Sequence, residues 1–458
     1  MFTDLQPYAQ LFEEYTELRV QENRQMIIAM INGDVMMNQK TSTSGVSARV
    51  YKQGCWGFAS HSDIDDDTIC QVINNAAENA DFLSAREPKQ VGSLPSSQAA
   101  ETHDFTTTSP RVSPKDCIDF LRMIDYYLQR HYTHLNARTL VLRTLDMEKT
   151  ILTSDASSSA SRTPRAVLSV TLSVIKDGKP VELYDVYGGF GQFEDNFSQI
   201  EPLFGQIDEQ YSHLLRKAEG VYPESGVAEC ILDAHVAGIL AHEAIGHTTE
   251  ADLVLGGSVA GDYLNQQVAS PLVSLVDFAH TAYKELCPVP VFVDDEGVKA
   301  EDVVLIEKGI LKGFMHNKES ARHFHVSPTG NARAFQCSDE PLIRMRNTAI
   351  LPGRNTLREM IASIDRGYYL MKASNGQADS TSEFMFGVVQ GYEIVHGRLG
   401  KAIRDTTISG VAFDMLKTVS MVSDEMVWNC CGICGKKQPI PVGMGGPAIK
   451  CLVTIGGK

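Results

Sequence analysis

Residue pairs that end in glycine separate strand-like runs along most of the chain. In QMIIAMINGDVMMNQ, Asn32-Gly33 stands between two apolar runs, and Gln53-Gly54 repeats this arrangement. A type I′ turn needs positive φ at both central residues, so such a pair between strand-like runs is a strong hairpin signal. The same pattern recurs at Asp177-Gly178, Lys308-Gly309 and His396-Gly397. The chain is therefore predicted to form antiparallel hairpins in both halves.

Helical patterns alternate with these hairpins in the first half. Residues 66–83 place apolar side chains at helical spacing, at Ile69, Val72, Ile73, Ala76, Ala77 and Ala80. Ser113, Pro114 and Asp116 resemble a capping box with proline in the first turn. The stripe predicted for this second helix is Cys117, Phe120, Leu121, Ile124 and Leu128. A third helix, ending near Gly220, carries Ile207, Tyr211, Leu214 and Leu215. Strands are predicted at 139–145, 166–175 and 181–188.

The fold class predicted from this alternation is α+β with two domains. EGVYPESG, residues 219–226, has turn-forming residues and no apolar period, which favours a domain boundary. Residues 1–220 are predicted to form an N-terminal α+β domain of antiparallel hairpins with flanking helices. Residues 221–458 are predicted to open with a motif helix and continue as a β-rich C-terminal domain. Residues 85–113, rich in Pro, Ser, Thr and Gln, are predicted to be a surface excursion.

The composition argues against a protein that binds nucleic acid, spans a membrane or is secreted. The net charge of -16 argues against a nucleic-acid partner, because a phosphate backbone needs a basic face. No apolar run approaches the ~18 residues that cross a bilayer, and the first twenty residues lack the pattern of a secretory signal. The ten cysteines are scattered through a large chain, which is typical of reduced thiols. We expect a cytoplasmic protein that binds neither nucleic acid nor membrane.

The segment AHEAIGHTTEAD, residues 241–252, combines two histidines with a glutamate. His242 and His247 are five apart, and on a straight helix such residues project roughly 140° from each other, so they could not share one ion. Gly246 could end or unwind the turn, and a π-bulge would also bring the second histidine beside the first. A metal site here therefore requires the helix to end, bulge or unwind before His247.

Two other interpretations fit the same segment. Glu243, His247 and Glu250 would align on one face of an undistorted helix, and that stripe could also bind a metal. Alternatively, the segment is a partly buried helix whose histidines bond to the backbone.

A catalytic zinc typically takes three protein ligands and leaves one position open, so a third ligand must come from elsewhere. WNCCGICGKKQPIPVGMGG offers three thiols in five residues, Cys430, Cys431 and Cys434. The pair Cys431 and Cys434 also forms a C-x-x-C, which could be a redox pair or half of a structural zinc site.

The pairing of HEAIGHTTEAD with ICGKKQPIPVGMGGPAIK resembles the TldD/PmbA family of metalloproteases, once described as modulators of DNA gyrase. The family pattern H-E-x-x-x-H matches at His242, Glu243 and His247, and the cysteine that precedes Gly-Lys falls on Cys434. The likeness extends over nearly the whole chain, in SGVSARVYKQGCWGFAS, VASPLVSLVD, VDDEGVKAEDVVLIEKGILKGFMHNKESA, IRMRNTAILPG and DTTISG.

This resemblance implies a zinc peptidase with one ion per active subunit, held by His242, His247 and Cys434. Glu243 would act as general base on a zinc-bound water. Family members act on small or unfolded polypeptides, held as an added β-strand, and form two-subunit assemblies. A homodimer, or a heterodimer with a related subunit, is therefore expected, with this chain as the active type. Two alternatives remain open: a non-enzymatic regulatory or binding subunit whose metal is structural or absent, and a C-x-x-C redox protein.

Overall fold

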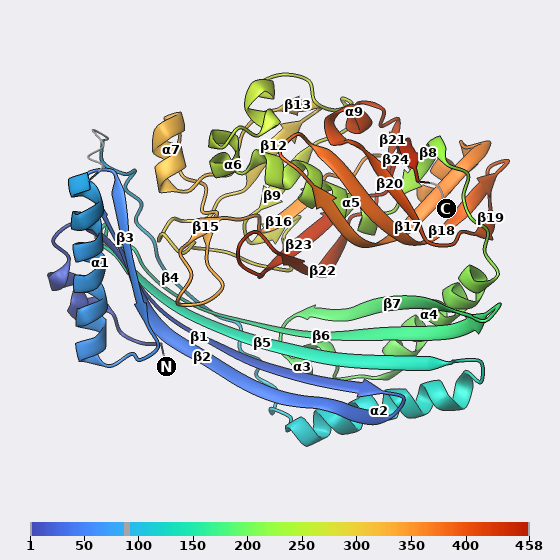
Figure 1. Ribbon diagram of the computed structural model, residues 1–458, viewed down its shortest axis with the longest axis horizontal. Helices are drawn as coiled ribbons and strands as arrows, with labels where there is room; N and C mark the ends of the chain where they lie inside the picture. The colour runs from blue at the N-terminus through green and yellow to red at the C-terminus, as the bar shows by residue number, and fades with distance from the viewer. Residues whose placement is uncertain (1, 87–91, 457–458) are drawn as a thin grey trace.

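The structure is a computed structural model that describes residues 2–86 and 92–456. Its N-terminal half is a long curved sheet that lies beneath the C-terminal half in Figure 1. The strand order is β3-β2-β1-β5-β6-β4, with β7 also paired to β6, and every neighbouring pair is antiparallel except β4 and β6. The strands are β1 (Tyr15–Ile31), β2 (Asp34–Lys52), β3 (Cys55–His61), β4 (Ala100–Asp104), β5 (Ala137–Thr153), β6 (Ser158–Lys176) and β7 (Lys179–Phe190).

The predicted hairpin turns are confirmed. Asn32 and Gly33 have φ of 50° and 92°, and β1 and β2 pair on either side of them. Both residues of each of the other four pairs also have positive φ, and the strands that flank each pair are antiparallel neighbours. Local turn chemistry therefore determines where the chain reverses in both halves.

The helices of the first half cover one face of the sheet. α1 packs on β2 and β3 and shares a core with β1, while α2 and α4 pack on β1, β5, β6 and β7. The predicted capping box at Ser113 and the buried stripe of α2 are confirmed. Leu215, predicted to be part of the α4 stripe, is 38% exposed instead. The elements are η1 (Gln6–Leu11), α1 (Asp66–Arg86), α2 (Pro114–His131), α3 (Phe193–Asn196) and α4 (Glu201–Ala218).

The segment predicted to be a surface excursion contains a strand. β4 pairs in parallel with β6, from Ala100 opposite Ser158 to Asp104 opposite Arg162. The sequence AETHD has no apolar run, so the strand depends on backbone pairing with β6. Residues 87–91 of the same segment lie outside the described residues.

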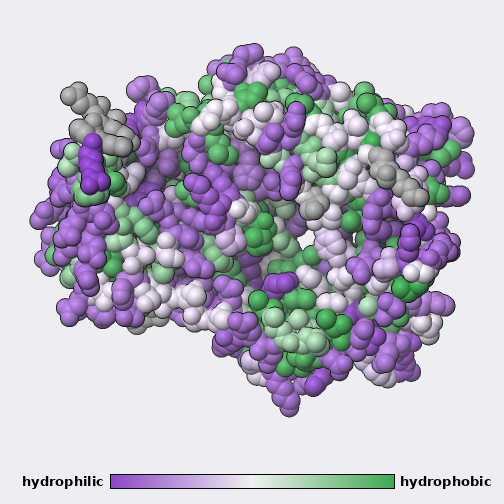
Figure 2. Space-filling view, viewed as in Figure 1, coloured by the Kyte–Doolittle hydropathy of each residue, from purple (hydrophilic) through white to green (hydrophobic). Residues whose placement is uncertain are grey.

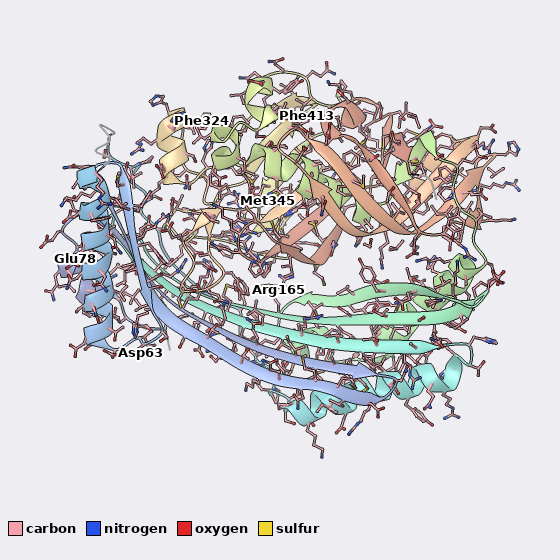
Figure 3. All side chains as sticks on the ribbon, in the orientation of Figure 1. Asp63, Glu78, Arg165, Phe324, Met345 and Phe413 are labelled. Atoms are coloured by element: carbon pink, nitrogen blue, oxygen red, sulfur yellow. The ribbon has the colours of Figure 1, made fainter. Side chains whose placement is uncertain are left out.

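The opposite face of the sheet is polar but buried. Leu18 and Val20 of β1 point into the core under α1, whereas Glu17 and Arg19 alternate with them and face the C-terminal half. Arg19 Nη1 lies 3.7 Å from Asp295 Oδ2 in that half. Figure 3 labels Arg165, which also stands between the sheet and the C-terminal half. The polar side chains of β1 therefore lie at an internal interface. The same alternation in the sequence would also fit a strand with one face exposed to solvent.

The C-terminal half contains two larger sheets. In one, β17-β8-β24-β20-β18 closes on itself because β17 also pairs with β18, with β19 and β21 attached. The other has the order β13-β12-β9-β16-β23-β22. The half begins with strand β8, so the expectation that it opens with the motif helix is wrong. The strands are β8 (Gly226–Leu232), β9 (Leu275–Phe278), β10 (Thr281–Ala282), β11 (Glu285–Leu286), β12 (Val303–Glu307), β13 (Ile310–Leu311), β14 (Ala332–Arg333), β15 (Leu342–Ile343), β16 (Asn347–Ile350), β17 (Arg366–Ala378), β18 (Glu383–Val395), β19 (Arg398–Ala402), β20 (Thr406–Val411), β21 (Met421–Val422), β22 (Val427–Cys434), β23 (Ile440–Gly446) and β24 (Ile449–Ile455).

Helical elements of this half are short. They are α5 (Ala234–Leu240), η2 (Ala241–Gly246), η3 (His247–Thr249), α6 (Ala251–Leu255), η4 (Val259–Tyr263), α7 (Lys318–Phe324), α8 (Leu357–Ala362) and α9 (Ala412–Lys417). None of the helices in the described residues combines the length and apolar character needed to cross a bilayer. The protein is thus a mixed structure of helices and strands, while the proposed division into two domains at residue 220 stays a prediction.

Candidate metal centre

The segment with the histidines lies inside the C-terminal core. α5 follows β8 directly and contacts β17, β22 and β23. Val236, Ala237 and Leu240 are fully buried. Gly238 allows this close packing, because a Cβ at that position would lie 3.0 Å from the backbone nitrogen of Gly445 on β23. The small and apolar residues of α5 therefore seat the motif between the two large sheets.

The helix widens where the sequence predicts a distortion. After α5 the chain forms a π-helical turn, η2, and then a 3-10 turn, η3. The N–H of His247 donates to the carbonyl of His242, which is the i to i+5 bond of a π-helix. One such turn brings residues five apart to the same side, and the two imidazole centroids are 5.3 Å apart. The predicted bulge before His247 is confirmed.

Gly246 serves a different purpose from the one expected. Its φ of -56° and ψ of -55° are ordinary helical values that any residue can adopt. The expected use of glycine's conformational freedom is therefore wrong. A Cβ at Gly246 would instead lie 1.9 Å from Sδ of Met345, which Figure 3 labels in the interior of this half. The glycine is required because the π turn packs directly against Met345.

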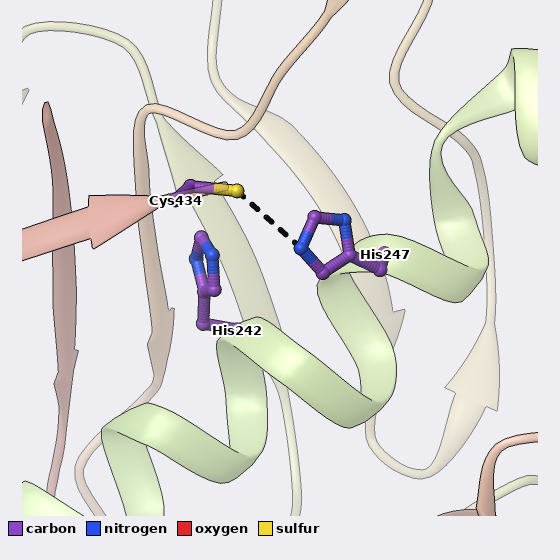
Figure 4. A group of neighbouring side chains, drawn as sticks. All are labelled: His242, His247 and Cys434. Atoms are coloured by element: carbon purple, nitrogen blue, oxygen red, sulfur yellow. Dashed lines mark hydrogen bonds between the residues drawn. The ribbon is translucent and has the colours of Figure 1, made fainter. Parts of the chain in front are cut away.

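The third side chain comes from a distant strand. Cys434 is the last residue of β22, and its hairpin with β23 carries it to the π turn. One ligand atom from each of His242, His247 and Cys434 lies within 4.8 Å of the others. Figure 4 shows the three side chains converging, with Cys434 Sγ 3.4 Å from His247 Nε2.

Burial and charge set the protonation of these side chains. His242 is 1% exposed, and neither of its ring nitrogens has a hydrogen-bond partner among the described residues. Burial raises the pKa of Cys434, but the adjacent imidazoles of His242 and His247 outweigh it and lower that pKa to about 3. Burial lowers the pKa of His247, but Cys434 and Glu250 outweigh it and raise that pKa to about 10. In the absence of a metal these shifts favour a Cys434 thiolate paired with a protonated His247, and binding of a metal would release the proton of His247.

Glu250 has a role that the sequence analysis did not identify. Its Oε2 lies 2.9 Å from His247 Nδ1, and its side chain is fully buried. This contact turns the other nitrogen, Nε2, toward Cys434. A carboxylate that fixes the far nitrogen of a ligand histidine is a common support of metal sites. The alternative Glu243/His247/Glu250 stripe required an undistorted helix, which the π turn contradicts; Glu250 instead orients His247. Its position three residues after His247 was the available signal.

The other two clustered thiols point elsewhere. Cys430 Sγ lies 3.7 Å from the carbonyl of Trp428, and Cys431 Sγ lies 3.8 Å from the carbonyl of Gly188. Burial raises the pKa of both, that of Cys431 to about 12. Cys434 alone of the three belongs to the histidine cluster.

Glu243 lies where two hollows meet. Its Oε2 is 3.8 Å from His247 Nε2, and its side chain is 26% exposed. One hollow, of about 510 Å³, lies between β7, α5, β17 and β22; the other, of about 1190 Å³, extends toward β18 and β20. Both are lined by Glu243, Gly376 and Ile433. Figure 2 shows an opening between the two halves of the molecule, beside β22.

The donor set fits a zinc ion. Two imidazoles and a thiolate are ligands that zinc prefers, and three protein ligands leave a coordination position free. The unpartnered nitrogens of buried His242 support this fit, because buried polar atoms in proteins almost always have a partner.

Comparison with known proteins identifies the family. The model of the PmbA/TldA metallopeptidase C-terminal domain matches residues 225–457, and that of domain 1 of the same metallopeptidases matches residues 16–80. This chain belongs to the PmbA/TldD family. A metalloprotease TldD homolog of Haemophilus influenzae is 31% identical over 74% of this chain and 72% of its own length. A zinc metalloprotease TldD homolog of Saccharolobus solfataricus is 27% identical over 89% of this chain and 88% of its own length.

The fold agrees with a solved structure of this family. TldE from Thermococcus kodakarensis superposes with a TM-score of 0.78 at 18% identity, covering 98% of both chains. The PmbA/TldD family is a metallopeptidase family, so a metal is implied for this chain.

Proposed function

We propose that this chain is a zinc-dependent peptidase that hydrolyses small or unfolded polypeptides in the cytoplasm. The observation that carries the proposal is the convergence of His242, His247 and Cys434, with both nitrogens of buried His242 unpartnered. These three side chains would hold one zinc ion per active subunit. When bound, zinc supplies Lewis acidity, which polarises a carbonyl and lowers the pKa of water toward neutrality.

In this proposal Glu243 is the general base. It follows a ligand histidine directly, yet its carboxylate faces the hollows and is partly exposed. Its Oε2 would accept the proton of the attacking water and later deliver it to the leaving amine. Glu250 holds His247 through Nδ1, so the two glutamates have separate tasks.

The hollows support an extended peptide as substrate. β22 is the terminal strand of its sheet, and its residues Cys430 to Ile433 line the hollow beside Glu243. An unfolded segment could add to β22 as a further strand through backbone hydrogen bonds. Recognition of this kind uses the backbone and is tolerant of sequence.

We also propose that the active assembly contains two subunits, either two copies or this chain with a related one. Support comes from β2, whose residues 34–45 pair with β1 alone in the described part of the chain, since β3 covers β2 from Val46 onward. Val35, Met36 and Met37 are exposed on this free edge. A long unprotected edge strand is a template for pairing with another chain. Sedimentation of the purified chain, alone and with a related subunit, measures the assembly.

Glu243→Gln tests the hydrolytic mechanism. Zinc content and cleavage of an unfolded polypeptide are measured together for the wild type, the variant and Glu307→Gln, a control at an exposed glutamate on β12. General acid–base catalysis contributes about 10²- to 10⁴-fold, so Glu243→Gln should lose that much activity while keeping its zinc. Full activity in this variant refutes the assigned role. Stoichiometric zinc without hydrolysis in the wild type, alone or with a partner, favours a non-enzymatic subunit.

A further inference from the structure

Lys436 connects the two segments that bear the proposed ligands. It stands two residues after Cys434, yet its Nζ lies 2.6 Å from Asp252 Oδ2 and 3.2 Å from Glu250 Oε2, both beyond the π turn. Nζ also donates to the carbonyl of Ile343 at 3.1 Å. With its side chain 11% exposed, the ammonium has exchanged water for protein oxygens.

The oxygen that Lys436 contacts is the one that orients His247. Glu250 Oε2 accepts from His247 Nδ1 at 2.9 Å and lies next to the ammonium, whereas its Oε1 has no partner among the described residues. One carboxylate oxygen therefore links the loop after Cys434 to the second histidine. Without Lys436, this fully buried carboxylate would keep only the imidazole as its partner.

The backbone of the same loop is held from inside. Arg344, fully buried, donates to the carbonyl of Cys434 at 2.8 Å and to that of Gln438 at 2.9 Å. These bonds secure both ends of residues 434–438 but reach no histidine. Lys436 is the side chain of this loop that reaches toward His247 through Glu250.

We infer that Lys436 is a positioning residue that ties the cysteine loop to His247 through Glu250 and thereby raises the zinc affinity of the site. The inference rests on the proposed zinc site. The direction in which zinc affinity changes on removal of Lys436 tests this role. A lysine acting only through its charge would repel a nearby cation, so its removal would tighten zinc binding. A lysine acting as a tie would, on removal, weaken it.

Zinc affinity of the full chain decides between these roles. Competition with a chromophoric chelator gives the Kd of the wild type, Lys436→Met, Lys436→Arg and Lys437→Met. Lys437 is the matched control, since it is the next residue, is exposed and forms no ion pair among the described residues. Cobalt spectra report the geometry around the thiolate, and thermal unfolding of the metal-free proteins reports folding.

We expect Lys436→Met to raise the zinc Kd by about 10- to 100-fold, as losses of outer partners of metal ligands do. Lys436→Arg should restore most of the affinity, and Lys437→Met should match the wild type. An unchanged or lower Kd in Lys436→Met overturns the inference while leaving the zinc site intact. A wild type that binds no zinc refutes the proposed function itself, and this inference with it. If Lys436→Met does not fold, Lys436→Gln replaces it and must weaken zinc binding to a similar degree.

Discussion

Two buried polar clusters in this protein differ in how their members are satisfied. At the interface between the halves, Arg49 pairs with both Glu17 and Glu296. At the metal centre, His242 is equally buried but has no hydrogen-bond partner among the described residues. Burial of polar groups is therefore no sign of a functional site, because the interface shows it too. Unpartnered atoms alone do not separate the two clusters, because Arg19 at the interface also has unpartnered nitrogens, although its Nη2 donates to three carbonyls. His242 differs because its whole ring lacks a partner among the described residues and lies beside two other side chains of the kind that bind metals.

The largest expected effect is the loss of zinc binding when one of the proposed ligands is removed. His242→Ala and Cys434→Ser should each lower zinc affinity by more than the roughly 100-fold that follows loss of an outer partner. Zinc per chain after dialysis measures this. Cys431→Ser is the control, since its thiol points to Gly188, and it should retain zinc and activity. Equal damage from Cys431→Ser and Cys434→Ser would instead favour the C-x-x-C redox protein.

Breaking the interface cluster should cost stability and leave the metal in place. Arg49→Met leaves Glu17 and Glu296 buried without their cation, which should lower the free energy of unfolding by about 3–5 kcal/mol. Denaturant unfolding measures this. Arg366→Met removes an ion pair with Glu224 in which both side chains are 74% exposed, and it should cost under about 1 kcal/mol. If both variants lost similar free energies of unfolding, the expected difference between buried and exposed ion pairs would be contradicted.

A smaller effect is expected where the metal centre meets the core. Gly246→Ala places a methyl group against Met345, and overpacking of this kind typically costs about 1–3 kcal/mol. Because the π turn would shift, zinc affinity should fall as well. Met345→Ala in the same chain makes room and should recover part of both losses. A double variant no better than Gly246→Ala would show that the glycine is needed for its backbone.

A pH dependence of the interface is a separate expected effect. Burial raises the pKa of Glu17 to about 7 from an ordinary 4.5; Arg49 opposes this shift and Glu296 adds to it. The folded state therefore holds this proton more tightly than the unfolded state. The resulting stability is complete below about pH 4.5 and is lost as the pH rises through about 7. Relative to Glu17→Gln, the wild type should lose stability across this window in unfolding curves, and a constant difference would contradict the shift.

The sequence predicted much of the local structure and the residues of the candidate site. Hairpin turns and the Ser113 cap were predictable because each depends on residues that are neighbours in the chain. The distortion between His242 and His247 followed from helical geometry, while the choice of Cys434 over its neighbours came from family resemblance. β4 was missed because AETHD lacks an apolar pattern, and Gly246 was explained wrongly because Met345 is distant in sequence.

By itself, the sequence determined the turns, the caps and the need for a bulge in the motif, since these follow from local backbone and side-chain chemistry. Only the tertiary structure decided that the polar face of β1 is buried, that Glu250 orients His247, and that Lys436 reaches Glu250. These contacts join segments that no local pattern relates, so they exist only once the core has brought the segments together.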